Sequence, residues 1–176
     1  PKADVTKVLA PYSDRMKKLL KDPEAFYTPK GRPSGHDIGS GFGKDNGGAI
    51  PSNLLQIPNT DSNGAYLRGC KAVGTKGHPA RFPAKLPEFF IKFLTEPGDL
   101  VVDIFGGSNT TGRVAEDLGR KWKSFELDRD YIAASAFRFM DPDADTAELQ
   151  EVFAAIKAQK PMKLQRQAEL FASAAE

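Results

Sequence analysis

The chain has 176 residues, of which 40% are hydrophobic and 27% are charged. This size and composition suit one compact domain with a short appendage and exclude a disordered or fibrous protein. No apolar run approaches the roughly 18 residues of a membrane span, and the sequence does not open like a signal peptide, so we expect no membrane partner and a cytoplasmic location. The single cysteine and two histidines give no internal disulfide and no zinc cluster, and we expect Cys70 to be buried or half-buried.

The formal net charge of +2 is divided unevenly along the chain. Residues 1–98 hold 15 Lys and Arg against 9 Asp and Glu, a net charge of +6, whereas residues 99–176 hold 10 against 14, a net charge of −4. A basic first part would attract a phosphate backbone, and an acidic second part suits a neutral or cationic small ligand. Two differently solvated surfaces explain this division equally well.

The first predicted element is one short amphipathic helix within residues 7–20, with Ser13 as its N-cap and Pro11 as a break or start. Residues 28–64 are so rich in Gly, Pro, Ser and Asn that they cannot hold a long helix. A loop of this length inside a compact domain is typically functional or disordered.

Polar side chains within this loop are of the types that contact DNA. We expect Arg32 and Lys44 to contact phosphates. Base edges are the expected partners of His36, Asp37 and Asn46. The alternative is a surface loop with no part in DNA recognition.

Strands and helices alternate in the second half of the chain. Short β-branched or aromatic runs predict strands at 100–104 and 122–125. Apolar residues at helical spacing predict helices at 87–94, 110–118, 131–140, 146–159 and 162–175. This alternation indicates an α/β fold with a parallel sheet and right-handed crossovers.

The glycine-rich motif, residues 103–112 (DIFGGSNTTG), lies where a buried strand turns into a helix. Open α/β folds bind ligands at this point. Gly106 and Gly107 let a ligand touch the backbone, and the next helix presents free N–H groups and the positive end of its dipole. Glu126, twenty residues after Gly106 at the end of the next strand, has the position of an acid that binds the two hydroxyls of a ribose.

Three kinds of ligand use this geometry. The glycines at 106, 107 and 112 do not fit the G-x-G-x-x-G pattern of a dinucleotide site. Gly107 and Gly112 have the spacing of a phosphate-binding P-loop, but Arg113 and Val114 replace its lysine and hydroxyl residue. A nucleoside without phosphates remains, and S-adenosylmethionine (AdoMet) fits that description. The alternative is a glycine-rich turn with a capping serine.

The proline-rich motif, residues 78–87 (HPARFPAKLP), lies shortly before the glycine-rich motif. Taken alone it is a proline-pinned loop in which His78 is a structural histidine. The order of the two motifs resembles motif X followed by motif I in the β-group of DNA amino-methyltransferases, which methylate adenine N6 or cytosine N4. In that family the recognition region precedes motif X, where this chain has its basic, glycine-rich loop.

Six segments of the chain are similar to a cytosine-N4 modification methyltransferase of this group. They are VTKVLAPY (5–12), RPSGHDI (32–38), KDNGG (44–48), HPARFPAKLPEFF (78–90), VVDIFGGSNTTG (101–112) and AASAFRF (133–139). The resemblance covers roughly residues 1–140 and includes the recognition loop. It implies double-stranded DNA as the partner, the palindrome CAGCTG as the substrate site, and a restriction-modification system.

The resemblance also implies an AdoMet-dependent methyltransferase (Rossmann-like) fold, here its C-terminal portion. It divides the chain into a target-recognition segment (1–77), an AdoMet-binding α/β portion (78–140) and a helical tail (141–176). Glu126 would bind the ribose, and Asp103 would orient the methionine ammonium. The methionine side and adjacent backbone would lie along Phe105, Gly106, Gly107, Ser108, Asn109 and Thr110. The residues expected to close over the cofactor are His78, Arg81, Phe82 and Pro83.

The catalytic loop of the family, [Asp/Ser/Asn]-Pro-Pro-[Tyr/Phe/Trp], has no match, because no Pro-Pro pair occurs in the chain. In the β-group order this loop belongs upstream of Pro1. We therefore expect no catalytic residue here, no activity of the chain alone, and an N-terminal catalytic half as its partner in cis or in trans. The alternatives are a non-catalytic DNA- or partner-binding module with a methyltransferase shell, an adenine-N6 enzyme, a small-molecule or RNA methyltransferase and, more distantly, a dehydrogenase.

Overall fold

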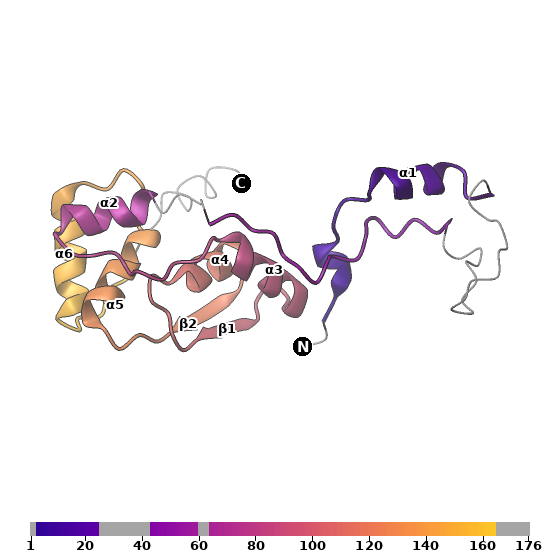
Figure 1. Cartoon of the computed structure of the whole chain (residues 1–176). Coiled ribbons are helices and arrows are strands. Elements are labelled where there is room, and N and C mark those ends of the chain that lie inside the picture. Colours follow the sequence, from indigo (N-terminus) through magenta and orange to yellow (C-terminus); the bar gives the residue numbers. More distant parts are fainter. Residues whose placement is uncertain (1–2, 25–42, 60–63, 165–176) are drawn as a thin grey trace, which may run out of the picture. The chain divides into compact units, whose positions relative to one another are not determined.

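The structure is a computed structural model that describes residues 3–24, 43–59 and 64–164 (Figure 1). Its contacts divide the chain into two compact units, Pro1–Leu55 and Gln56–Glu176. The predicted division by function, with a boundary after residue 77, concerns roles rather than packing and stays a prediction.

The first unit contains a 3-10 turn, η1 (Val5–Val8), and helix α1 (Asp14–Lys21). Ser13 is the N-cap of α1, as predicted, because its Oγ accepts a hydrogen bond from the backbone N–H of Met16 at 3.2 Å. The helix covers only the second half of the predicted range, residues 7–20, and extends one residue beyond it. Pro11 and the extended residues around it separate α1 from η1.

A two-way backbone bridge closes this unit. The N–H and C=O groups of Ala10 and Ala49 bond each other at 2.9 Å in both directions. Gly48 permits this approach, since a Cβ at that position would lie 2.8 Å from the Ala10 carbonyl oxygen. The bridge brings residues 43–50 next to the start of the chain.

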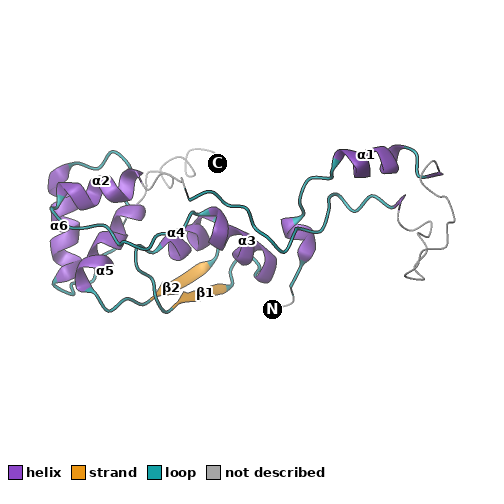
Figure 2. Ribbon diagram, viewed as in Figure 1, coloured by secondary structure: helices purple, strands orange, loops and turns teal. Residues whose placement is uncertain are grey.

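The second unit holds a parallel pair of strands, β1 (Leu100–Asp103) and β2 (Lys121–Ser124) (Figure 2). In their register, Leu100 is paired with Lys121. Helix α4 (Thr110–Asp117) connects them, and α3 (Lys85–Leu94) precedes β1. The predicted helix, strand, helix, strand order over these four elements is therefore confirmed, with their ends shifted by at most two residues.

One face of this sheet is covered and the other is not. Val101 and Trp122 pack with Ile91 of α3 and with Val114 and Ala115 of α4. On the opposite face, Leu100 and Val102 are 53% and 51% exposed, and the β2 residues in register with them are exposed lysines. Among the described residues, nothing packs over these side chains, so a strongly apolar strand keeps one open face.

A separate core lies among α2 (Gly64–Ala72), α5 (Arg129–Ser135), η4 (Ala136–Arg138) and α6 (Thr146–Lys157), which lie side by side in Figure 1. Its buried residues are Tyr66, Cys70, Ala134, Ala136, Phe137, Met140, Leu149 and Val152. Cys70 is 2% exposed, which confirms its expected burial. Gly69 lets α2 approach η4, since a Cβ there would lie 2.6 Å from the Phe137 ring.

Two outcomes in this core differ from the expectations. Helix α2 was not predicted, because its start falls in the glycine-rich loop and its only buried apolar pair is Tyr66 and Cys70. The predicted helix at 131–140 begins two residues earlier, at Arg129, after its N-cap Asp128, and is followed by η4 from Ala136. Helix α6 confirms the prediction at 146–159, whereas 162–164 are not helical and the rest of the predicted last helix lies outside the described residues.

Candidate cofactor site and DNA-recognition segment

The loop between β1 and α4 is tied to the end of β2. Asp103 ends β1, and its Oδ1 accepts a hydrogen bond from the Phe105 N–H at 3.0 Å. The Gly106 N–H donates to the Phe125 carbonyl at 2.8 Å, and a Cβ on Gly106 would lie 2.0 Å from the Ser124 Oγ. Glycine at 106 thus lets the loop pack closely against the end of β2, while the Phe105 side chain is 84% exposed.

Two left-handed residues turn this loop into α4. Gly107 has φ of 51° and Asn109 has φ of 56°. Asn109 is the N-cap of the helix, because its Oδ1 accepts from the Gly112 N–H at 3.1 Å. The alternative interpretation of this motif, a glycine-rich turn, expected a serine as the cap. The N-cap is instead Asn109.

The side chains of Ser108, Asn109 and Thr110 are buried, each 4% exposed. Ser108 Oγ and Thr110 Oγ1 lie 3.3 Å apart and share a hydrogen bond. These side chains are buried and hydrogen-bonded within the protein. The loop therefore presents mainly backbone groups to a ligand, in particular around Gly106 and Gly107.

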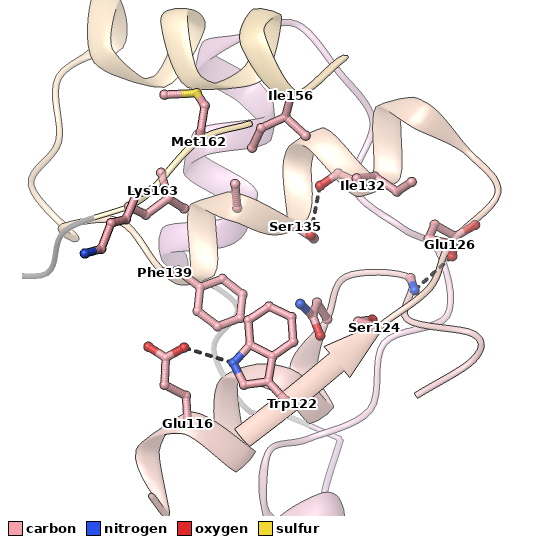
Figure 3. Close-up of a pocket in the computed structure, with 14 residues that line it drawn as sticks. Glu116, Trp122, Ser124, Glu126, Ile132, Ser135, Phe139, Ile156, Met162 and Lys163 are labelled. Carbon is pink, nitrogen blue, oxygen red and sulfur yellow. Dashed lines mark hydrogen bonds between the residues drawn. The ribbon is translucent and has the colours of Figure 1, made fainter. Parts of the chain in front are cut away.

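The Glu126 carboxylate is held by three backbone N–H groups, and the bond from Gly107 is the dashed line at Glu126 in Figure 3. Oε2 accepts from Gly107 at 2.9 Å, and Oε1 accepts from Leu127 at 2.8 Å and from Asp128 at 3.0 Å. These bonds, that from Asp128 first, keep the pKa of Glu126 below its ordinary value. A carboxylate has about four acceptor positions, so one remains, on Oε2. The carboxylate is thus ionised, oriented and able to accept one more hydrogen bond without losing a present one.

The proline-rich motif lies against the glycine-rich motif. The His78 ring lies close to Gly107, where a Cβ would be 3.1 Å from the ring, and packs edge-on against Tyr131 with centroids 4.6 Å apart. His78 Nδ1 lies 2.9 Å from the Ala80 carbonyl, so the proton is on Nδ1 and Nε2 is the free acceptor in the neutral ring. The structure therefore brings together the two motifs that the sequence predicted to act together.

The remaining residues of this motif have mixed environments. Arg81 donates a hydrogen bond to the His78 carbonyl. Pro83 is buried and its carbonyl accepts from Leu86 at 3.0 Å, whereas Phe82 is 38% exposed. The Phe82 side chain is therefore available to a ligand.

Two residues near the loop were missed in the sequence. Arg138 donates to the Ser108 carbonyl at 2.5 Å and to Ser108 Oγ at 2.9 Å, and its guanidinium lies 4.8 Å from the centre of the Tyr66 ring. Burial lowers the pKa of Arg138 to about 10 and raises the pKa of Tyr66 to about 12, so neither group changes its charge near pH 7. No local pattern points to either residue, because Arg138 contacts Ser108 and Tyr66 across 30 and 72 positions of the chain.

A cavity of about 440 Å³ opens beside Glu126 and Gly107 (Figure 3). Its size falls within the range of small-molecule sites. Trp122 and Phe139 stack at 4.8 Å on one side, and Trp122 Nε1 donates to Glu116 at 2.9 Å. The other lining residues are Asn109, Ser124, Ile132, Ser135, Ala136, Ile156, Met162, Lys163 and Leu164.

Of the predicted DNA contacts, Lys44 and Asn46 are described, whereas Arg32, His36 and Asp37 lie outside the described residues. Lys44 and Asn46 are exposed on a turn that Tyr12 holds. The Tyr12 hydroxyl donates to Asp45 Oδ1 at 3.0 Å and accepts from the Asn46 N–H at 2.8 Å. The turn therefore presents polar side chains from a fixed backbone.

The described ranges contain no group of three His, Cys, Asp or Glu residues able to hold a metal ion. Within them, no helix has the length and apolar character needed to cross a membrane.

The DNA methylase family model (N6_N4_Mtase) matches residues 2–137. Since this is more than half of the chain, the chain belongs to this family, and the resemblance read from its motifs is confirmed.

Curated relatives agree with this assignment. The type II methyltransferase M.PvuII of Proteus hauseri is 69% identical over 153 residues, which are 87% of this chain and 46% of that protein. The type II methyltransferase M.XycI of Xanthomonas campestris pv. cyanopsidis is 35% identical over 101 residues, 53% of this chain and 34% of that protein. The chain thus spans less than half the length of these relatives.

A solved structure, the PvuII DNA methyltransferase (cytosine-N4-specific), matches with a TM-score of 0.60 and 62% identity over 62% of this chain and 39% of that one. The predicted α/β methyltransferase fold is confirmed by this match.

Proposed function

We propose that this chain is the cofactor-binding and DNA-recognition portion of a site-specific DNA methyltransferase that transfers a methyl group from AdoMet to cytosine N4. The 69% identity to M.PvuII and the cytosine-N4 specificity in the name of the matching structure support the target atom. The same likeness supports the site CAGCTG and a role in a restriction-modification system. The match includes the recognition loop, which is the part of such an enzyme that decides the site.

The observation that carries the proposal is the junction of Gly107, Glu126 and His78. Gly107 and Glu126 both line the cavity, so a ligand bound there would meet backbone rather than a side chain at position 107. The remaining acceptor position on the Glu126 carboxylate suits a ribose hydroxyl, and an ionised carboxylate makes the stronger, charge-assisted bond. The residues present therefore fit a nucleoside-containing cofactor.

AdoMet would supply the electrophilic methyl group. The chain's own residues would bind and orient it: Glu126 at the ribose, the backbone from Phe105 to Thr110 along the methionine side, Asp103 toward the ammonium, and the loop from His78 to Pro83 as a cover. The target base would leave the duplex at a cost of a few kcal/mol. No residue of this chain is assigned to hold that base.

The open face of the sheet supports a catalytic half as partner. Leu100, Val102 and Ile104 are 51 to 64% exposed, which is unusual for the central strand residues of an α/β fold. The matched parts make up 46% and 34% of the two relatives, so more than half of each relative lies outside the match. We infer that a further polypeptide portion, carrying the Pro-Pro loop, packs over this face.

The DNA-facing part of the proposal rests on the first unit. Exposed Lys44 suits a phosphate and exposed Asn46 suits a base edge, since amide groups pair well with adenine. Arg32 is assigned to phosphate, and His36 and Asp37 to bases, on the sequence alone.

Titration calorimetry tests the cofactor assignment. The chain, alone and mixed with the portion of M.PvuII that it does not match, is titrated with AdoMet and with NAD. We expect saturable binding of AdoMet and none of NAD. Binding of NAD, or of neither ligand in both preparations, would contradict the proposed function.

A further inference from the structure

Arg138 is bonded to one residue of the glycine-rich motif through two donors. Its Nε and Nη2 reach the carbonyl and the hydroxyl of Ser108, at 2.5 and 2.9 Å. The Arg138 carbonyl accepts in turn from Arg113 Nη1 of α4 at 2.5 Å. A planar guanidinium with two fixed donors defines both the place and the orientation of Ser108, which a lysine ammonium cannot do.

Tyr66 connects the same arginine to the proline-rich motif. Its ring lies under the Arg138 guanidinium at 4.8 Å, and its hydroxyl accepts from the His78 N–H at 2.9 Å. Tyr66 is 1% exposed and belongs to the core among α2, α5, η4 and α6. The hydroxyl therefore fixes the backbone of His78 from a rigid support.

These contacts form one connected network beside the candidate site. Arg138 holds Ser108, which follows Gly107; the His78 ring lies against Gly107; and Tyr66 joins His78 back to Arg138. The two motifs come from segments with no backbone hydrogen bond to each other among those described. The spacing between them thus depends on side chains outside both motifs.

We propose that Arg138 and Tyr66 are positioning residues that set the spacing between the proline-rich motif and the glycine-rich motif and thereby the affinity for the cofactor. The proposal rests on the AdoMet site proposed above. Neither residue touches the ligand in this account; each acts through Ser108, Gly107 or His78. Preorganised loops lose less conformational entropy when a ligand binds. Loss of the Arg138 or Tyr66 contacts should therefore weaken cofactor binding without removing a contact to the cofactor itself.

Two conservative variants test this. Arg138→Lys keeps the charge and loses the two-donor fork, and we expect the Kd for AdoMet to rise about tenfold. Tyr66→Phe keeps the ring under the guanidinium and loses only the hydroxyl, with an expected rise of about fivefold. The matched control is Arg120→Lys: Arg120 is 9% exposed and bonds Thr95 and Leu118, away from both loops.

The proteins are compared by calorimetry with AdoMet, by thermal unfolding and by hydrogen exchange of residues 76–84 and 103–112, with the uncovered portion of M.PvuII present. We expect faster exchange of both segments and weaker AdoMet binding in the two test variants, whatever their Tm, and a lower Tm without either change in Arg120→Lys. Equal losses of Tm in all variants, with unchanged exchange and Kd, would make Arg138 and Tyr66 structural residues and overturn the proposal. If the parent protein does not bind AdoMet, the proposed function fails, and the exchange data still decide whether the two residues position the loops.

Discussion

The candidate cofactor site and the candidate DNA-reading turn are built in opposite ways. Around Gly107, backbone groups and buried side chains form the site, and Ser108, Asn109 and Thr110 are each 4% exposed. The turn at Lys44 and Asn46 is one fixed backbone with side chains directed into solvent. A change in the first site should disturb a packed neighbourhood, whereas a change in the second should remove one contact. The predictions below use this difference.

The largest effect is expected for Gly107→Val. A Cβ at 107 would lie 3.1 Å from the His78 ring, and the φ of 51° is unfavourable for a β-branched residue. AdoMet binding should be lost in calorimetry. The control is Gly98→Val, because Gly98 has φ of 89° with no atom within 4 Å of its Cβ position. If both variants bind AdoMet equally, Gly107 is not at the site.

Glu126→Gln should weaken AdoMet binding at least tenfold. An amide group places an NH₂ where the carboxylate now accepts from Gly107 or from Leu127 and Asp128, and it also weakens the bond to a ribose hydroxyl. Calorimetry on the folded variant measures the effect, and near-UV circular dichroism checks the fold. An unchanged Kd with intact structure would remove Glu126 from the cofactor site.

His36→Ala and Lys44→Ala separate base reading from phosphate binding. His36→Ala should cost about 1 to 3 kcal/mol on CAGCTG and much less on random DNA. Lys44→Ala should weaken binding to both DNAs and reduce the slope of log K against log salt by about 1. Lys71→Ala serves as a charge-matched control in the other unit. Equal losses on both DNAs for His36→Ala would make it a positioning residue. No loss for either variant would place recognition elsewhere.

The smallest effect concerns pH. The Glu126 pKa is lowered, so the stability from its hydrogen bonds is fully present above its unfolded pKa and is lost only as the pH falls through the folded pKa. The ratio of Kd values for Glu126→Gln and the parent chain should therefore stay constant between pH 7 and about pH 5.5. Taking this ratio cancels other titrating groups. A ratio that falls toward one in this range would contradict an ionised Glu126.

Sequence reasoning succeeded where short-range patterns decide the structure. The N-cap at Ser13 and the strand before Gly106 follow from residue types at fixed spacing. Glu126 was found by its distance from Gly106, but its three backbone donors were not, because they depend on how the chain turns after β2.

The failures share a physical cause. Helix α2 carries only a weak apolar pattern and is stabilised by packing of Tyr66 and Gly69 against distant segments. The bond from Arg138 to Ser108 spans 30 positions, and no local spacing specifies it. Tertiary packing decides both features, so the support of the site was harder to predict than its glycines and its acid.

Methyl transfer to DNA tests the central claim most directly. The 176-residue chain is mixed with the portion of M.PvuII that it does not match, and transfer of labelled methyl from AdoMet is measured on duplexes with and without CAGCTG. We expect cytosine-N4 methylation of the CAGCTG duplex by the mixture and none by either part alone. Methylation by the isolated chain, or none by a mixture that forms a stable complex and binds AdoMet, would contradict the account.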